Sequence, residues 1–272
     1  MKQQPHIIFA GAGPGDPDLV TMKLVECLKT CECILVDRLV NPEILRRYAS
    51  QTAEIIFVGK QAYQKESTDQ ADINQLLIAK TMIGLKTLRL KGGDVAIYSN
   101  VFDEIKAISD HGITYEIIPG ITTASGAVAS LGIGLTGRGV APGVQYHSMS
   151  VTQPPGEVEL KHWALTEDTL VFYMSTAALK LLTKKLLEYG ASPEKPLVII
   201  EDATSPMQQN HFYTLFSLAF HQGDLAFKSP SIIIIGDILQ YSLQSAQEIS
   251  PDAHTLFEPI NSITKNISIH VI

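Results

Sequence analysis

The chain has 272 residues, of which 45% are hydrophobic and 18% are charged, and its formal net charge at pH 7 is −7. This composition is that of an ordinary globular protein, and the length suits one large core or two modest ones. The acidic balance disfavours sequence-independent binding to nucleic acid. No apolar run reaches the ~20 residues of a membrane helix. We therefore expect no nucleic-acid partner and no membrane partner.

The N-terminal residues and the cysteines indicate the compartment. Residues 1–5 lead straight into an apolar strand, without the apolar stretch of a signal peptide. Cys27, Cys31 and Cys33 lie in one short segment, and their odd number argues against a disulfide framework. A metal site there would lack nearby histidines, and buried free cysteine is the commoner case. We expect a reduced, cytoplasmic protein without a bound metal.

The first part of the chain alternates short apolar strands with amphipathic helices. Strands are predicted at residues 6–10, 33–36, 55–58, 87–90 and 115–118. Helices are predicted at residues 21–29, 42–49, 70–83 and 101–110. This alternation is typical of an α/β layer with a mainly parallel sheet.

The pattern changes near residues 119–124, where a helix of small residues and then a glycine-rich stretch begin. The helix is predicted at residues 124–131, and later helices at 177–189 and 215–222. Further strands are predicted at residues 145–151, 169–173, 197–200, 211–214 and 231–236. We therefore expect an N-terminal α/β domain at residues 1–118, a C-terminal α/β domain with a more mixed sheet at 119–249, and a tail at 250–272.

A glycine-rich loop, Ala10-Gly11-Ala12-Gly13-Pro14-Gly15-Asp16-Pro17, follows the first strand. Its glycines let the backbone approach a ligand closely, as in dinucleotide sites. Pro14, however, removes an amide donor that a pyrophosphate cradle needs, and Asp16 adds a negative charge. A rigid, acidic loop suits a positively charged ligand such as the sulfonium of S-adenosylmethionine (SAM). The loop therefore favours a SAM site over a nicotinamide dinucleotide site.

Other blocks accompany this loop in a fixed order. The stronger ones are Asp37-Arg38-Leu39-Val40, Val58-Gly59-Lys60, Arg89-Leu90-Lys91-Gly92-Gly93-Asp94 and Pro119-Gly120-Ile121-Thr122. Two weaker ones are Leu135-Thr136-Gly137-Arg138 and Phe172-Tyr173-Met174. In this order and spacing, over roughly residues 6–240, the chain resembles the uroporphyrinogen-III C-methyltransferases of the tetrapyrrole methylase family.

That resemblance implies a fold, a cofactor and an assembly. The fold is the two-domain tetrapyrrole-methylase (class III SAM methyltransferase) arrangement, with the ligand cleft between the α/β domains. The methyl donor is S-adenosyl-L-methionine, which becomes S-adenosyl-L-homocysteine, and no metal takes part. The implied reaction is C-methylation of uroporphyrinogen III to precorrin-2, in siroheme or cobalamin synthesis, by a homodimer.

The resemblance also implies roles for particular residues. Asp37 and Lys60, each just after a strand, match the acid–base pair, although by themselves they would be interpreted as a turn cap and a solvated lysine. The implied substrate carries eight carboxylates and needs basic partners, and Arg38 and Arg138 are available to bind them. The residues implicated in SAM binding are Pro14, Gly92, Gly93, Asp94, Ile97, Thr122, Thr123, Met174 and Ala203.

The chain departs from the family pattern on the substrate side. Asn100 stands where the family has an arginine, Val101 and Phe102 replace glycines, and Gly137 replaces a histidine. Two alternatives therefore stay open: a paralogue that methylates a different acceptor, and a SAM-binding protein with little turnover. The intact pair of Asp37 and Lys60 argues against the second alternative.

Overall fold

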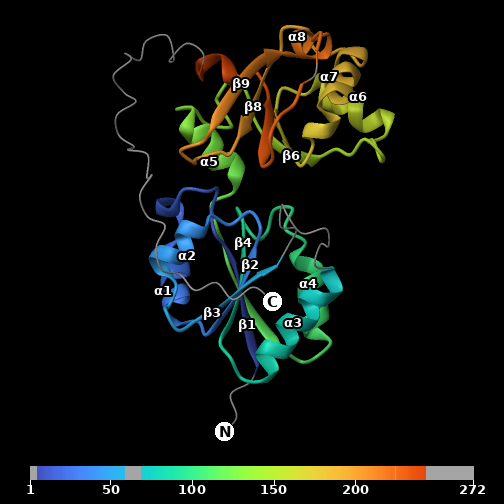
Figure 1. Ribbon diagram of the computed structural model, residues 1–272. Coiled ribbons are helices and arrows are strands. Elements are labelled where there is room, and N and C mark those ends of the chain that lie inside the picture. Colours follow the sequence, from blue (N-terminus) through green and yellow to red (C-terminus); the bar gives the residue numbers. More distant parts are fainter. Residues whose placement is uncertain (1–4, 59–68, 224, 243–272) are drawn as a thin grey trace, which may run out of the picture. The chain divides into compact units, whose positions relative to one another are not determined.

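The computed structural model describes residues 5–58, 69–223 and 225–242. These residues form two compact units that divide between Thr123 and Ala124, and we describe each unit by itself (Figure 1). The domain boundaries predicted at residues 118/119 and 249/250 stay predictions. The second of them, with the predicted tail, lies outside the described residues.

The N-terminal unit is built on a five-stranded sheet with the order β3-β2-β4-β1-β5. Every neighbouring pair of strands is parallel. Each strand begins and ends within one residue of its prediction, which confirms the parallel α/β layer. The strands are β1 (His6–Gly11), β2 (Cys33–Asp37), β3 (Glu54–Val58), β4 (Thr87–Lys91) and β5 (Thr114–Ile118).

Helices cover both faces of this sheet (Figure 1). Helices α1 (Met22–Thr30) and α2 (Pro42–Tyr48) pack on one face, against side chains that include Ile34 and Leu88. On the other face, α3 (Gln70–Met82) and α4 (Val101–Ser109) pack against alternate strand residues that include Phe9 and Leu35. Because successive strand residues point to opposite faces, burial of both faces makes the inner strands β1 and β2 almost uniformly apolar.

The three cysteines are buried free thiols of the N-terminal unit, as expected from the sequence. The sulfur atoms of Cys27 and Cys31, one turn apart at the end of α1, lie 3.4 Å from each other. Burial raises the pKa of the Cys33 thiol to about 11. These side chains therefore act as small hydrophobic groups in the core.

The C-terminal unit has a second five-stranded sheet, with the order β6-β7-β10-β8-β9. Strands β6 and β7 are parallel, and the other neighbouring pairs are antiparallel, which confirms the mixed sheet. The strands are β6 (Val144–Ser148), β7 (Thr169–Tyr173), β8 (Pro196–Glu201), β9 (Gln209–Thr214) and β10 (Ser231–Ile235).

The two faces of the second sheet are covered differently. The small-residue helix α5 (Thr123–Ser130) packs on one face, against side chains that include Val171 and Ile200. The other face, with Phe172 and Ile199, packs against α6 (Glu157–Leu165), α7 (Leu179–Glu188) and α8 (Leu215–Ala219). Helix α6 was not predicted, because the exposed apolar residues Val158 and Leu165 blur the helical period of its buried residues. Among the described helices none is long and apolar enough to cross a membrane.

Three loops of the N-terminal unit meet at glycines. The carbonyl oxygen of Gly93 accepts a hydrogen bond from the Gly13 N–H at 3.1 Å. An added Cβ at Gly11 would lie 2.5 Å from this oxygen, and one at Gly120 would lie only 2.3 Å from it. No side chain fits at that separation, so the loops after β1, β4 and β5 approach one another through bare backbone.

We expect Gly120→Ala to lower the free energy of unfolding by about 1–3 kcal/mol, because the new methyl group would overlap the Gly93 carbonyl and push a loop aside. Urea unfolding followed by circular dichroism measures the change. The matched control is Gly156→Ala, where an added Cβ meets nothing within 4 Å. Gly156→Ala should lower the free energy of unfolding clearly less than Gly120→Ala. Equal decreases would contradict the proposed overlap with the Gly93 carbonyl.

Candidate active site

The parallel order of the first sheet brings distant motifs to one edge. All five strands end at the same edge of the sheet, which in α/β sheets is where ligands bind. Asp37 ends β2, and Pro14 lies in the loop after β1. The block that contains Gly92 follows β4, and Thr122 lies in the loop after β5. Lys60, which follows β3, lies outside the described residues.

Backbone hydrogen bonds join the loops after β1 and β4. The Ala12 N–H donates to the carbonyl of Lys91 at 2.8 Å, and Gly13 and Gly93 exchange hydrogen bonds of 3.1 and 2.8 Å. An added Cβ at Gly92 would lie 2.9 Å from the Cβ of Leu39, in the loop after β2. Protein packing at this edge thus already requires glycine at these positions.

The other predicted SAM residues of this unit lie in tight, half-buried turns. Asp94 accepts a hydrogen bond from the Ala96 N–H at 2.7 Å, and its carbonyl accepts one from the Ile97 N–H at 3.2 Å. Thr123 begins α5, directly after Thr122. These turns hold a carboxylate, an apolar side chain and two hydroxyl groups at the edge of the sheet.

Asp37 is the predicted acid–base residue that the structure describes. Its side chain is 31% exposed. One oxygen, Oδ1, accepts a hydrogen bond from the Leu39 N–H at 3.2 Å, and the other, Oδ2, lies 3.7 Å from Nη2 of Arg89. Asp37 thus caps a turn, as the plainer interpretation expected, and also faces a buried cation. Arg38, its neighbour, is exposed.

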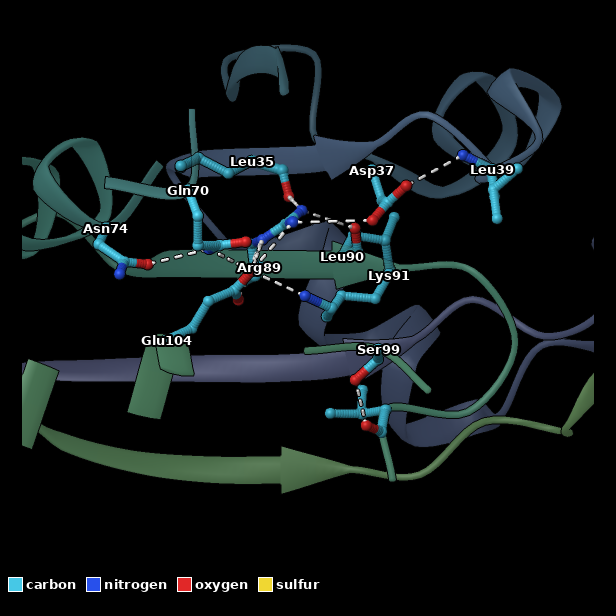
Figure 2. A network of polar contacts seen from close by, with 11 residues as sticks. Leu35, Asp37, Leu39, Gln70, Asn74, Arg89, Leu90, Lys91, Ser99 and Glu104 are labelled. Atoms are coloured by element: carbon cyan, nitrogen blue, oxygen red, sulfur yellow. Dashed lines mark hydrogen bonds and ion pairs between the residues drawn. The ribbon is translucent and has the colours of Figure 1, made fainter. Parts of the chain in front are cut away.

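A buried charged cluster lies behind Asp37 (Figure 2). Arg89, Lys91 and Glu104 have side chains that are at most 3% exposed. The Lys91 Nζ donates to Glu104 Oε1 at 2.7 Å. Arg89 donates to the same carboxylate from Nε and Nη2, each at 3.2 Å from the nearer oxygen. Two buried cations thus share one buried anion.

This cluster was not predicted from the sequence. In β4, Arg89 and Lys91 alternate with Leu88 and Leu90, so the cations point to one face and the leucines to the other. Two cations on one face of a strand at the centre of a parallel sheet signal a buried ionic partner, since such residues are almost never buried unpaired. The partner, Glu104, comes from the helix that covers that face.

In the C-terminal unit, two predicted SAM residues lie at the carboxyl ends of β7 and β8, which run in the same direction on either side of β10. Met174 follows β7, and Ala203 lies just after β8. Met174 has a φ of +54° and is 68% exposed, whereas Ala203 is buried between Asp202 (φ +46°) and Thr204 (φ +64°). Left-handed backbone at three residues other than glycine is strained, and such strain gathers at functional sites.

Arg138 lies elsewhere in the sequence of this unit, in the loop closed by a bridge between Gly137 and Ala141. This exposed arginine lines a cavity of about 410 Å³ whose other residues are Thr136, Gly137, Gly139, Ala141 and Pro142. The cavity is open to solvent, so it offers a guanidinium group to an anionic ligand.

Within residues 5–58, 69–223 and 225–242, no three histidine, cysteine, aspartate or glutamate side chains gather in a way that could hold a metal ion.

Comparisons with known proteins identify the class of this chain. Residues 6–219 match the family of Tetrapyrrole (Corrin/Porphyrin) Methylases. The chain therefore belongs to this family, and its two-sheet α/β architecture is the two-domain fold of tetrapyrrole methyltransferases.

Individual relatives are similar over most of this chain. It is 37% identical over 240 residues to a siroheme synthase of Saccharophagus degradans, and the aligned region covers 88% of this chain and 52% of that protein. It is 36% identical over 248 residues to a uroporphyrinogen-III C-methyltransferase of Bacillus subtilis, which covers 90% of this chain and 51% of that protein. The chain thus spans about half the length of these relatives.

A solved structure is similar as well. The uroporphyrin-III C-methyl transferase of Thermus thermophilus, in complex with S-adenyl homocysteine, has a TM-score of 0.73 and 30% sequence identity. The match covers 87% of this chain and 94% of that chain.

Lys91 generates a prediction about pH. Burial, and then the positive charge of Arg89, lower the pKa of Lys91 below its ordinary value of 10.5. Between the two values the unfolded chain binds more protons than the native protein, so the stability contributed by Lys91 rises with pH. We expect the free energy of unfolding of the wild type, minus that of Lys91→Met, to increase as the pH is raised toward 10.5.

Urea unfolding at several alkaline pH values measures this difference. Lys106→Met, which removes an exposed lysine from α4, serves as the control and should show no comparable trend. If the free energy of unfolding of the wild type minus that of Lys91→Met falls with pH, the pKa of Lys91 is not lowered in the folded protein.

Proposed function

We propose that this chain is a SAM-dependent methyltransferase that converts uroporphyrinogen III to precorrin-2 by C-methylation at two ring carbons. The observation that carries the proposal is the convergence of motifs from four separate loops at one edge of the first sheet, in a member of the tetrapyrrole methylases. The similarity to a transferase that was solved with S-adenyl homocysteine supports the choice of cofactor.

The residues at the two sheet edges fit the chemistry of SAM. Asp94 supplies a carboxylate for a ribose hydroxyl or for the amino group of the methionine part. Ile97 and Met174 supply apolar surface for the adenine ring. The exposure of Met174, an apolar side chain held out from strained backbone, supports such a role. Pro14, Gly92, Gly93, Thr122, Thr123 and Ala203 complete the proposed set.

Methyl transfer demands both alignment and proton removal. Bound SAM would supply the methyl group from its sulfonium centre. The protein must hold the acceptor carbon in line with that group, which is a positioning task. Once the carbon–methyl bond has formed, the tetrapyrrole must lose a proton. We assign Asp37 to accept it as a carboxylate, with Lys60 as the second member of the acid–base pair.

The substrate side of the proposal depends on arginines. Uroporphyrinogen carries eight carboxylates, so it needs locally basic contacts on an acidic protein. We assign Arg38, exposed next to Asp37, and Arg138, beside its open cavity, to bind two of these carboxylates. Arginine suits this task because its guanidinium binds a carboxylate through two parallel hydrogen bonds.

The setting of the enzyme belongs to the same proposal. We propose a homodimer that acts in the cytoplasm, and a place in siroheme or cobalamin synthesis. The similarity to a siroheme synthase supports the siroheme branch.

A second candidate is a paralogue that methylates a different acceptor. Asn100, where the family has an arginine, adopts a φ of +57° and makes no capping hydrogen bond at the start of α4. Phe102, where the family has glycine, is 76% exposed. An exposed aromatic ring in place of a cationic, flexible segment favours a less anionic acceptor.

One experiment separates the two candidates. The protein is incubated anaerobically with SAM and uroporphyrinogen III, and the absorbance of the methylated product is followed, while calorimetry measures S-adenosylhomocysteine binding. We expect both turnover and binding. Binding without turnover would favour the paralogue or a SAM-binding protein with little turnover, and absence of binding at millimolar ligand would overturn both candidates.

We expect Asp37→Asn and Lys60→Met each to lower kcat by about 10²- to 10⁴-fold, the range of acid–base catalysis. Affinity for S-adenosylhomocysteine, measured by calorimetry, should stay nearly unchanged. Asp72→Asn, which neutralises an exposed carboxylate on α3, is the matched control. A loss of affinity as large as the loss of rate would show instead that Asp37 and Lys60 serve ligand binding.

A further inference from the structure

We propose that Arg89 is a positioning residue for Asp37, and that Glu104 holds Arg89 in place from the opposite side. This inference rests on the proposed function, because it concerns the carboxylate assigned there as the base. It adds to that function a buried link from the catalytic edge of the sheet to helix α4.

The side chain of Arg89 has little freedom to move. Its side chain is 3% exposed, and Nε and Nη2 are both held by Glu104. The third nitrogen, Nη1, donates to the backbone carbonyls of Leu35 and Leu90 at 3.5 and 3.4 Å. A guanidinium with all three nitrogens engaged presents a fixed cation to its neighbours.

The fixed guanidinium of Arg89 faces Asp37. Nη2 of Arg89 lies 3.7 Å from Oδ2 of Asp37, and the Leu39 N–H holds Oδ1 (Figure 2). Both oxygens of the carboxylate therefore have a positively polarised neighbour. The pair fixes the direction in which Asp37 points at the end of β2.

The charges of the cluster balance only when Asp37 is included. Arg89 and Lys91 contribute two positive charges, and Glu104, which is fully buried, contributes one negative charge. The carboxylate of Asp37 is the fourth group, and it brings the sum to zero. Buried charges are screened much less than surface charges, so the net positive charge of the other three groups attracts the Asp37 carboxylate toward Arg89.

The cluster also has a supporting layer. Gln70, at the start of α3, donates to Glu104 Oε1 at 3.4 Å and to Asn74 at 3.1 Å. Glu104 thus receives hydrogen bonds from a strand and from a second helix, which fixes the anchor of Arg89.

The test begins with Arg89→Met and Arg89→Lys in the full chain. We expect Arg89→Met to lower kcat on uroporphyrinogen III by about 10- to 100-fold, as a misplaced catalytic group does. Affinity for S-adenosylhomocysteine should change less than twofold. Arg89→Lys should have a higher kcat than Arg89→Met, because the lysine ammonium restores the positive charge but not the planar guanidinium with its several donors. Arg46→Met, which removes an exposed arginine of α2, is the control.

Glu104→Gln is the second variant, for the case in which Arg89→Met does not fold. The amide keeps the shape of the side chain but loses the charge that anchors Arg89. We expect a fall in kcat, again with retained affinity for S-adenosylhomocysteine. A loss of affinity that matches the loss of rate, or an unchanged kcat in a folded variant, would overturn the proposal.

A thermal-unfolding cycle tests the link without any substrate. Asp37→Asn is made in the wild type and in the Arg89→Met background, or in Glu104→Gln if the former does not fold. We expect Asp37→Asn to shift the unfolding midpoint less in the second background, because its cationic neighbour is gone or displaced. Equal shifts would overturn the inference even if wild-type turnover confirms the proposed function. Unequal shifts would support it even if uroporphyrinogen III is not the acceptor.

Discussion

The close approach of three backbone segments at the carbonyl of Gly93 is the constraint on which the candidate active site depends. Strands β1, β4 and β5 lie side by side in the sheet, and the loops that follow them must turn within a few ångströms of one another. An added Cβ at Gly11 or Gly120 would lie within 3 Å of Gly93. Side chains are thereby excluded from the centre of the edge, and the functional groups gather around it.

The charged cluster at the carboxyl end of β4 follows a different physical principle. Burying three ionised groups is costly, and such a cluster adds little net stability compared with an apolar core of the same shape. Its contribution is geometric, because an arginine held by Glu104 and by two carbonyls cannot change its direction. The cost of burying these charges thus falls next to Asp37, where the direction of the Arg89 side chain matters.

The C-terminal unit provides its candidate residues by strained backbone. Met174, Asp202 and Thr204 all adopt positive φ just after parallel-running strands. Strain of this kind persists only where well-packed strands hold it, and β7 and β8 are almost completely buried. Close packing of glycine loops is particular to the N-terminal unit, whereas strained backbone occurs in both units, at Tyr98 and Asn100 in the first and at these three residues in the second.

The sequence by itself determined the parallel layer of the first unit, because apolar runs and capping residues mark its strands and helices to within one residue. It also indicated the family, since the motif loops keep their order and spacing. Only the tertiary structure decided what Arg89, Lys91 and Glu104 do, because their partnership joins residues up to 15 positions apart through the packing of α4 on β4. Helix α6 likewise escaped prediction, since apolar residues on both its exposed and its buried side hide which side packs on the sheet.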